Sequence, residues 1–389
     1  MRTHALSQSL PTGAPATHHG RLKRKFAQLL ASADIAIDGE RPWDIRVRDD
    51  RLYRRLFLHG SLGAGEAYMD GWWDCEQLDD LIYRLLRSHL RPAFESHRTN
   101  LWGALGSRLI NQQSRSRAFT VGEVHYDIGN TLYERMLDSR MIYSCGYWRE
   151  AATLEDAQAH KLKLICQKLN LSPGMRVLDI GCGWGGLARY MAQDYGVAVV
   201  GLTISQAQAD YARTACRNLP IEIRLQDYRE LNDVFDRVVS VGMFEHVGYK
   251  NYRAYMKTVA RCLKDDGLFL LHTIGSTTTS HSTDPWINHY IFPNSMLPSI
   301  KQIATASEGL WVMEDWHNFS ADYDKTLMAW HGNFTRAWPQ LSATYSERFR
   351  RMWRYYLLTC AGTFRARDNQ LWQIVFSKNG VLGGYASVR

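Results

Sequence analysis

A glycine-rich turn that follows an apolar segment constrains the fold of this chain more than any other feature. The segment VLDIGCGWGG covers residues 177–186 and leads into the helical pattern LARYMAQDY. Its glycines carry no Cβ atoms, so a bound nucleoside can approach the backbone closely. A second apolar segment, VAVVGLTI, begins roughly twenty residues after the first, which is the spacing of a nucleotide-binding unit. Strand, turn, helix and strand in this order predict a βαβ unit that binds its ligand at the turn.

The same alternation of apolar segments and amphipathic helices continues along the chain. Three more segments are predicted as strands, IEIRLQDY, FDRVVSVGMFEH and GLFLLHTIG, and WQIVFSK near the C-terminus is predicted as another. Helices that alternate with strands at this spacing cover both faces of a parallel sheet. We therefore expect an α/β fold, a Rossmann-like domain with a doubly wound, mostly parallel sheet.

The first third of the chain lacks this alternation and is expected to form a small, mainly helical N-terminal domain. Residues 21–37 and the segment LDDLIYRLLRSHL have helical apolar spacing, whereas residues 41–60 alternate like short strands. Glycines at 60, 63, 65 and 71 are interpreted as turn positions. The stretch 91–118 is interpreted as a linker or docking helix. The predicted organisation is a disordered tail, an N-terminal domain with its linker, and a catalytic domain, at residues 1–20, 21–118 and 119–389.

The net positive charge of the chain indicates which classes of binding partner to expect. Lys and Arg total 47 and Asp and Glu total 39, and residues 1–120 hold 18 basic and 13 acidic side chains. A basic chain rich in Trp and Tyr favours an anionic partner, nucleic acid or lipid headgroups, although a basic protein without such a partner has the same composition. No apolar run is long enough to cross a bilayer, and the polar N-terminus does not resemble a secretory signal. We expect a cytoplasmic protein.

Seven cysteines stand without CxxC spacing. This pattern indicates reduced thiols and argues against a disulfide framework or a zinc site. We therefore expect no bound metal ion.

Two ligand classes compete for the glycine turn, a dinucleotide and S-adenosylmethionine. The sequence DIGCGWGG resembles the first motif of class I methyltransferases more than the dinucleotide-binding motif of dehydrogenases. The expected contacts on the turn come from Asp179, Gly181, Gly183 and Gly186. The second strand ends in VVGLTIS without the acidic residue that commonly binds the ribose hydroxyls, so Thr203 and Gln208 are expected to help hold the cofactor. Asp227, at the end of the third strand, is placed to bind the adenine amino group, or else it is an ordinary strand-end cap.

Ten segments, in order along the chain, resemble those of bacterial cyclopropane-fatty-acyl-phospholipid synthases, which are related to the mycolic acid cyclopropane synthases. The matching segments are EAYMDGWW (66–73), HYDIGNTLYERMLD (125–138), MIYSCGYW (141–148), VLDIGCGWGGLA (177–188), GLTIS (201–205), VSVGMFEHVG (239–248), FLLHTIG (269–275), DPWINHYIFPN (284–294), MEDWHNFSADY (313–323) and CAGTFRARD (360–368). The resemblance implies a class I methyltransferase domain behind a small N-terminal domain, and a homodimer.

The resemblance also implies a reaction. Members of this family add the methyl carbon of S-adenosylmethionine across a cis double bond in the acyl chain of a phospholipid. An alkene is a weak nucleophile, so the sulfonium methyl must be held within near-attack distance of it. The transfer leaves a carbocation, whose charge calls for aromatic faces and a base in a site that excludes water. In this family a bound bicarbonate ion takes the proton and the ring closes.

Carried over by motif, the predicted catalytic residues are Cys145, Glu245, His272, Ile274 through its backbone, Tyr323 and Cys360. The first five would surround the bicarbonate ion. Cys360 matches a cysteine considered as a nucleophile, but direct methyl transfer needs none, and we expect a packed thiol. Tyr143 and Ser144 match contacts to the methionine end of the cofactor. Glu245 and His272 also end the fourth and fifth predicted strands, at the edge where ligands of this fold bind.

Three alternatives are less well supported. A lipid or small-molecule C-methyltransferase that does not close the ring would share every motif except the proton-removing residues. A nucleic-acid methyltransferase fits the charge, but no NPPY-like loop or RNA-binding module is present, so no nucleic-acid partner is expected. A catalytically silent membrane protein would not need the intact glycine turn. The expected partner is a phospholipid bilayer, with the protein peripheral at the inner face of the cytoplasmic membrane and anionic lipids favoured.

Two further clusters leave their roles open. Trp286, Tyr290 and Phe292, followed by Trp316, Phe319 and Trp330, indicate either an aromatic core patch or the wall of a lipid tunnel. Arg348, Arg350, Arg351 and Arg354 indicate either a surface facing lipid headgroups or a solvated helix face.

Overall fold

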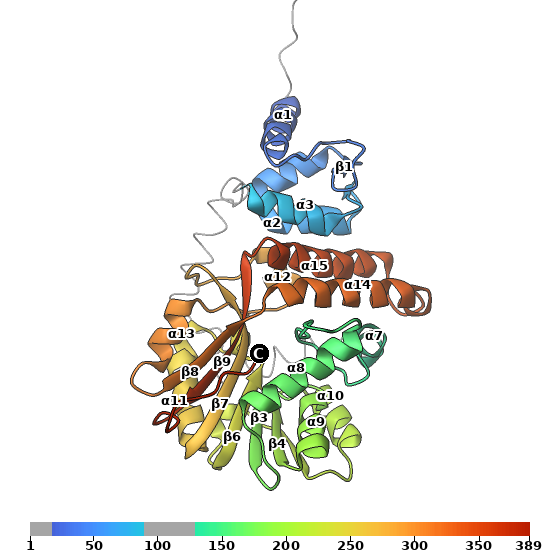
Figure 1. Ribbon diagram of the computed structural model, residues 1–389. Helices are drawn as coiled ribbons and strands as arrows, with labels where there is room; N and C mark the ends of the chain where they lie inside the picture. The colour runs from blue at the N-terminus through green and yellow to red at the C-terminus, as the bar shows by residue number, and fades with distance from the viewer. Residues whose placement is uncertain (1–17, 89–128) are drawn as a thin grey trace, which may run out of the picture.

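The computed structural model describes residues 18–88 and 129–389 (Figure 1). The predicted tail at 1–20, except for its last residues, and the predicted linker at 91–118 lie outside the described residues. The described elements form stacked tiers (Figure 1): a sheet flanked by helices, a pair of long helices across one end of it, and a helical tier beyond that pair.

The central sheet has seven strands in the order β5-β4-β3-β6-β7-β9-β8. Strands β3 to β7 run parallel, and β9 pairs antiparallel with both β7 and β8. The strands are β3 (Arg176–Ile180), β4 (Ala198–Thr203), β5 (Ile221–Leu225), β6 (Phe235–Val241), β7 (Leu263–Ser276), β8 (Val312–Asn318) and β9 (Asn369–Ser377). The predicted α/β fold with a doubly wound, mostly parallel sheet is confirmed.

Helices cover both faces of this sheet, so its inner strands are buried on both sides and consist largely of Val, Leu and Ile. The flanking helices are α8 (Leu154–Lys168), α9 (Gly186–Tyr195), α10 (Gln206–Ala215), α11 (Tyr252–Cys262) and α13 (Ile300–Ser307), whereas α12 (Pro285–Tyr290) lies beside α15 (Glu347–Arg365) (Figure 1). Short 3₁₀ turns follow two strand ends and precede α11, at η1 (Tyr228–Glu230), η2 (Phe244–His246) and η3 (Tyr249–Asn251). The strand order reverses between β3 and β6, and ligands bind at such a switch point in doubly wound sheets.

Strand β8 is one element that sequence patterns missed. It is an edge strand, and its first residues, Val312 and Met313, are 42% and 41% exposed. Acidic residues Glu314 and Asp315 follow them, so the segment has no strict alternation of apolar and polar side chains.

The N-terminal tier consists of α1 (His18–Ala31), β1 (Arg46–Val47), α2 (Arg51–Met69), β2 (Trp73–Asp74) and α3 (Leu78–Arg87). The prediction that residues 41–60 are short strands is wrong beyond Val47, because α2 begins at Arg51. Leu58 is 48% exposed on this helix and has no partner strand. The predicted helix at 21–37 ends early, at Ala31, because Asp34 adopts a φ of 56° and the chain turns back.

Two glycines predicted as turns instead permit close packing within α2. A Cβ on Gly65 would lie 2.3 Å from Cδ1 of Trp286, so only glycine lets this helix approach α12. Gly60 does break the helix locally, with φ 54° and ψ −130°. The prediction of a turn at Gly63 is wrong for the same reason as at Gly65, since its Cβ would lie 2.5 Å from the carbonyl oxygen of Arg55. Gly71, with a φ of 76°, is a turn as predicted.

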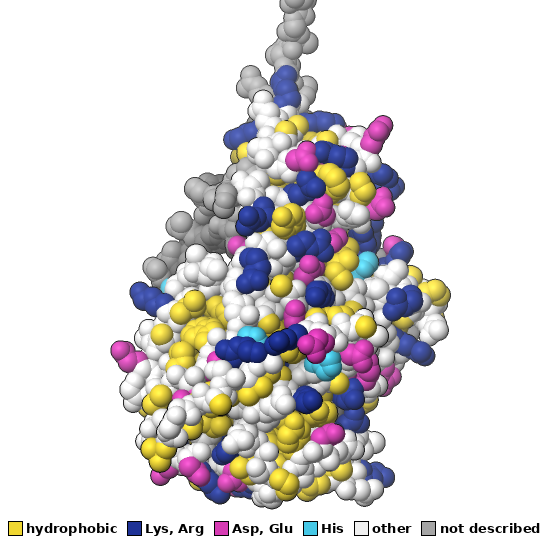
Figure 2. Space-filling view, viewed as in Figure 1, with side chains coloured by type: hydrophobic (Ala, Val, Ile, Leu, Met, Phe, Trp, Pro, Cys, Tyr) yellow, Lys and Arg dark blue, Asp and Glu magenta, His cyan; other side chains and the backbone are white. Residues whose placement is uncertain are grey.

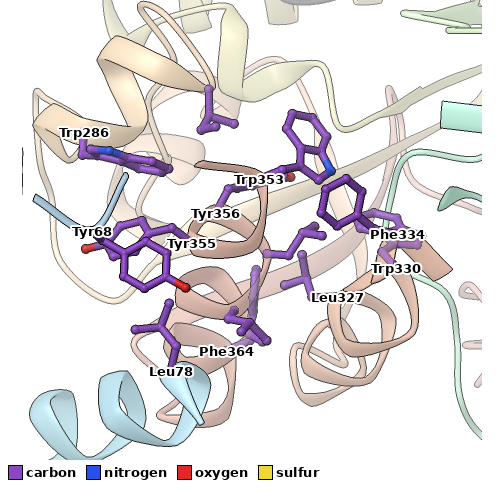
Figure 3. Packing of buried hydrophobic residues seen from close by; sticks show 14 of the residues in the cluster. Tyr68, Leu78, Trp286, Leu327, Trp330, Phe334, Trp353, Tyr355, Tyr356 and Phe364 are labelled. Carbon is purple, nitrogen blue, oxygen red and sulfur yellow. The ribbon is translucent and has the colours of Figure 1, made fainter. Parts of the chain in front are cut away.

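Helices α14 (Ala321–Leu341) and α15 (Glu347–Arg365) lie between the sheet and the N-terminal tier, and α7 (Asn130–Met136) packs against α14. Figure 3 shows side chains of α15 on two sides of the helix: Tyr355 lies beside Tyr68, and Trp353 lies beside Phe334. The ring centroids of Tyr68 and Tyr355 are 5.3 Å apart. Trp286 and Trp330 are each 1% exposed, so they belong to this aromatic core.

Three of the four clustered arginines of α15 bind the N-terminal tier, which corrects both earlier interpretations for Arg351 and Arg354, whereas the more exposed Arg348 and Arg350 remain on a solvated face. Arg351 donates to the backbone oxygen of Trp73 (2.9 Å) and to Asp74 (2.7 Å). Arg354 donates to the Tyr68 hydroxyl and to the backbone oxygen of Glu76. Arg348 pairs with Asp70 and Arg350 with Glu347, also within the protein. The guanidinium groups of Arg348, Arg351 and Arg354 therefore join α15 to residues that are far away in the chain.

Basic and acidic side chains are interleaved over the visible face of the N-terminal tier (Figure 2). Residues 18–88 contain 12 basic and 12 acidic side chains, so the positive excess of the first 120 residues stands outside them. Among the helices described in the structure, none is long and apolar enough to cross a bilayer.

Candidate active site

The glycine turn bends between β3 and α9 as its sequence predicts. Gly181 has a φ of 86°, and a Cβ there would lie 2.8 Å from Cβ of Met243. Gly183 has a φ of 54°, and a Cβ on it would meet no protein atom within 4 Å. The turn therefore presents bare backbone to an open space at the carboxyl end of the sheet.

This space is a cavity of about 190 Å³ at the ends of β3, β4, β5 and β6. All nine residues predicted to bind the cofactor line it: Tyr143, Ser144, Asp179, Gly181, Gly183, Gly186, Thr203, Gln208 and Asp227. The cavity lies where the strand order reverses, as expected for a nucleoside site in a doubly wound sheet.

Asp179 is a buried carboxylate beside the glycine turn. Its Oδ2 atom has no hydrogen-bond partner, and the residue is 1% exposed. Burial raises the pKa of Asp179 to about 7, although the nearby Lys161 ammonium lowers it. A buried carboxylate in this state favours a cationic or hydrogen-bond-donating ligand.

The polar residues at the next two strand ends are preorganised. The hydroxyl of Thr203 donates to Oε1 of Gln208 (2.9 Å), which leaves the Gln208 amide hydrogens as donors. Oδ1 of Asp227 accepts from the backbone N–H and from Nε of Arg229, both at 2.9 Å. Asp227 thus caps η1, the alternative considered for it, and also lines the cavity.

The segment before α8 supplies the opposite wall of the cavity. The hydroxyls of Tyr143 and Tyr356 are 2.9 Å apart. Ser144 is held by two residues of α8, since its carbonyl accepts from Gln158 (2.8 Å) and its Oγ accepts from Lys161 (3.0 Å).

None of the six predicted catalytic residues lines this cavity, but Cys145 and Glu245 are chain neighbours of Ser144 and His246, which do line it. Oε1 of Glu245 accepts from the backbone N–H of Ile274 (2.7 Å), which joins η2 to β7. Oε2 of Glu245 is buried without a partner. Burial raises the pKa of Glu245 to about 7, against the lowering effect of the bond from Ile274. The structure therefore brings Glu245 and Ile274 together, as the resemblance implies.

His272 lies two residues before Ile274 on β7 and is 1% exposed. Its Nδ1 is 3.2 Å from Nε2 of Gln373, the residue opposite it on β9. Because an amide nitrogen only donates, Nδ1 accepts and the proton of the neutral ring lies on Nε2. That Nε2 is buried without a partner. Burial lowers the pKa of His272 well below its usual value, which keeps the ring neutral.

Cys145 and Tyr323 complete the predicted set from two other elements. Cys145 is fully buried and donates to the carbonyl of Gly146 (3.1 Å), and burial raises its pKa well above the usual value. Burial and the nearby Cys145 and Glu245 raise the pKa of Tyr323 well above its usual value. The same interactions place Tyr323 near both residues.

Cys360 lies on α15, one helical turn after Tyr356. Burial raises the pKa of the Cys360 thiol to about 12. A thiol in this state stays protonated at neutral pH and is a poor nucleophile. The raised pKa favours the packed thiol that we expected over a covalent role.

Sequence reasoning missed three residues of the site. Gln373 could be found only from the register of β7 with β9, which no local pattern reveals. His246 lines the cavity next to Glu245, and burial lowers its pKa to about 4. Lys161 looks like an ordinary charge on an amphipathic helix, yet it is 1% exposed and lines the cavity. Within the described parts of the chain, no group of His, Cys, Asp and Glu could hold a metal ion.

Comparisons with known proteins agree with this geometry. The family model described as mycolic acid cyclopropane synthetase matches residues 113–374. The chain is 58% identical over 362 residues to cyclopropane-fatty-acyl-phospholipid synthase of Escherichia coli strain K12, a match that covers 93% of this chain and 94% of that protein. A probable fatty acid methyltransferase of Pseudomonas putida is 36% identical over 268 residues, covering 65% of this chain and 68% of that protein.

The fold is also similar to that of solved cyclopropane synthase structures. The cyclopropane synthase MmaA2 from Mycobacterium tuberculosis is 31% identical with a TM-score of 0.63, and the match covers 67% of this chain and 98% of that one. The mycolic acid cyclopropane synthase CmaA1, complexed with SAH (S-adenosylhomocysteine) and CTAB, is 32% identical with the same TM-score and coverage. Coclaurine N-methyltransferase, at 22% identity and a TM-score of 0.67, shares the fold.

Proposed function

The chain belongs to the mycolic acid cyclopropane synthetase family, and from that premise we propose how its residues close a three-membered ring. It is an S-adenosylmethionine-dependent enzyme that acts as a cyclopropane-fatty-acyl-phospholipid synthase. The observation that carries the proposal is that Oε2 of Glu245 and Nε2 of His272 are both buried and have no hydrogen-bond partner among the described residues.

The cavity residues fit S-adenosylmethionine by charge and by shape. Gly181 and Gly183 give close access to their backbone, and the open oxygen of Asp179 can accept from an ammonium group. The amide of Gln208 and the carboxylate of Asp227 are available to ribose and adenine. When bound, S-adenosylmethionine supplies the methyl carbon that becomes the third carbon of the ring.

Aromatic rings packed against Tyr143, which lines the cavity, and against Tyr323 can stabilise positive charge that develops on the acyl chain. Tyr143 lies 5.2 Å from Trp330, and Tyr323 stacks on Phe364 at 4.5 Å, measured between ring centroids. Electron-rich faces attract a cation, and their burial excludes the water that would otherwise trap it. Residues with these properties favour ring closure over hydration of the cation.

We propose that a bicarbonate ion occupies the space next to Glu245 and His272 and supplies the base that removes the proton. Nε2–H of His272 can donate to an anion, and its direction is fixed by Gln373. The open oxygen of Glu245 can accept the hydroxyl hydrogen of bicarbonate and so orient it. Buried polar atoms without partners are costly, and Glu245 accepts from Ile274, two residues after His272, so both atoms support a ligand near this end of β7. Cys145, Tyr323 and the backbone of Ile274 would form the remaining walls.

The alternative is a C-methyltransferase that does not close the ring. The similarity to the probable fatty acid methyltransferase of Pseudomonas putida is the reason to consider it. Such an enzyme needs the cofactor cavity but no base beside it. The burial of Oε2 of Glu245 and Nε2 of His272 without partners among the described residues favours the synthase, because a methyltransferase gains nothing from these costly atoms.

We further propose that the enzyme works as a homodimer at the inner face of the cytoplasmic membrane, bound peripherally with a preference for anionic lipids. The support for the lipid preference is the net charge of residues 1–120, and the dimer is what the resemblance to the family implies. The described residues 18–88 are neutral overall, so the excess charge comes from the sequence on either side of them. Sedimentation of the full chain tests the dimer directly.

Bicarbonate dependence tests the proposed base. Turnover with vesicles of unsaturated phospholipid should fall in buffer freed of carbon dioxide and recover when bicarbonate is added. His272→Ala should lower turnover by roughly a hundredfold, the scale for losing a positioned proton-transfer group. His160→Ala is the matched control, because that ring bonds the carbonyl of Arg149 near the surface of α8. Normal turnover in depleted buffer at every substrate level would reject the bicarbonate proposal.

A further inference from the structure

A buried lysine in the wall of the cofactor cavity has no role in the function described so far. Lys161 lies on α8 and is 1% exposed, and it lines the cavity together with Ser144 and Asp179. Fully buried lysines are rare unless a partner compensates their charge. The partner of this ammonium group therefore needs to be identified.

Among the described residues, a single acceptor bonds one of the three Nζ donors. Lys161 donates to Oγ of Ser144 at 3.0 Å. Among the described residues, no carboxylate lies within 4.0 Å of Nζ, so the group forms no ion pair. Asp138 and Asp179 act on it electrostatically from farther away, and burial still lowers the pKa of Lys161 to about 8. Two N–H bonds of a buried cation are left for a ligand.

Lys161 also determines what Ser144 can do. Because Nζ donates to the Ser144 oxygen, the serine hydroxyl hydrogen must point elsewhere. Gln158 lies three residues before Lys161 on the same face of α8. Its side-chain amide donates to the backbone carbonyl of Ser144 and so fixes the backbone there. The serine is thus held at both ends and has one donor left for the cavity.

The remaining charges of the cavity are already paired or have the opposite sign. Asp227 is bonded to Arg229, which neutralises both groups. Asp179 has an open oxygen and a negative charge when ionised. Lys161 and Asp179 are therefore one cationic and one anionic position on the same wall. This pair matches the zwitterionic amino-acid end of S-adenosylmethionine, which carries one carboxylate and one ammonium group.

We propose that Lys161 binds the α-carboxylate of the cofactor, directly and through the Ser144 hydroxyl, while Asp179 binds its α-ammonium group. The inference rests on S-adenosylmethionine being the ligand of this cavity. It makes Lys161 a specificity-determining residue, which distinguishes the intact amino-acid end from analogues without a carboxylate. The methyl donor is then held by its far end, which fixes the direction of its sulfonium group.

The test measures binding by calorimetry, without turnover, for three probes. S-adenosylhomocysteine carries both charged groups, S-adenosyl-3-thiopropylamine keeps the amine but lacks the carboxylate, and 5′-methylthioadenosine lacks both. Lys161→Met should weaken S-adenosylhomocysteine by roughly thirtyfold to a hundredfold, the scale for losing a charged hydrogen bond. The same variant should bind the two probes without a carboxylate within about threefold of the parent, a difference near the noise of such measurements.

Two variants control the result. Lys163→Met removes the same charge from an exposed position on α8 and should change none of the three affinities. Asp179→Asn should weaken the two amine-containing probes and spare 5′-methylthioadenosine. If Lys161→Met weakens all three probes equally, or leaves S-adenosylhomocysteine unchanged, Lys161 is a structural cation and the inference is overturned.

Two further outcomes distinguish a failure of the role of Lys161 from a failure of the cofactor assignment. If the parent enzyme binds none of the three probes, the cofactor assignment itself fails. If Lys161→Met does not fold, the parent enzyme decides: it must bind S-adenosylhomocysteine at least roughly tenfold tighter than S-adenosyl-3-thiopropylamine. Equal affinity for these two probes would overturn the role of Lys161.

Discussion

Replacing Glu245 by glutamine should stabilise the protein while it abolishes most of its activity. Glu245 is 5% exposed, and burial raises its pKa from 4.5 to about 7. A carboxyl group whose pKa is raised by folding destabilises the folded state wherever it is ionised. This cost is absent below pH 4.5, grows as the pH rises and is complete above about pH 7. At 1.36 kcal/mol per pH unit, the full cost is about 3 kcal/mol.

Glutamine keeps the acceptor for the N–H of Ile274 but carries no charge. Denaturant unfolding should show that the stability of Glu245→Gln relative to the parent increases by about 2 kcal/mol between about pH 5.5 and about pH 8.5. Any fixed cost of the new amide cancels in this difference. Turnover should fall by roughly a hundredfold, because the amide cannot replace an oriented carboxylate.

Glu308→Gln is the matched control, since Glu308 is exposed on the surface. It should leave both stability and turnover unchanged at each pH. A stability difference for Glu245→Gln that does not vary with pH would refute the argument that this carboxylate is buried at a cost for the sake of the reaction.

The other predictions follow from single features of the site. Gly183→Val places a branched side chain at a φ of 54° in the cofactor cavity, and Asp179→Ala removes the open carboxylate of the cavity. Calorimetry should find that both folded variants have lost cofactor binding. Unchanged affinity in either variant would refute the assignment of the turn. Cys360→Ser should keep turnover within about threefold of the parent, because a thiol with a pKa of about 12 is not the nucleophile, whereas loss of activity with unchanged stability would indicate a covalent role. Vesicle sedimentation should show preferential binding to anionic lipids that weakens as salt shortens the Debye length, and equal binding to zwitterionic vesicles at all salt concentrations would contradict the membrane proposal.

The sequence predicted those parts of the site that depend on local order along the chain. The strand, glycine turn and helix around Asp179 follow from apolar spacing and from the need for bare backbone, so the cofactor cavity could be located without coordinates. The strand ends that carry Glu245 and His272 could be placed at the same sheet edge, because parallel strands of this fold end together.

The parts that could not be predicted depend on contacts between distant segments. Gln373 meets His272 only through the antiparallel register of β9 with β7, which is set by the whole sheet. The arginines of α15 looked like a lipid-facing or solvated surface, because their partners at Trp73 and Asp74 are far away in the sequence. The glycines of α2 looked like turns, because nothing local indicates that Trp286 packs against Gly65.

The most direct test of ring formation uses S-adenosylmethionine with a fully deuterated methyl group. The enzyme is incubated with vesicles of unsaturated phospholipid, and the acyl chains are analysed by mass spectrometry before and after catalytic hydrogenation. Ring closure removes one deuteron from the transferred methyl group, so the predicted product retains two deuterium atoms and resists hydrogenation. A product that retains all three deuterium atoms and takes up hydrogen would show methylation without ring closure and would contradict the proposed role of Glu245 and His272.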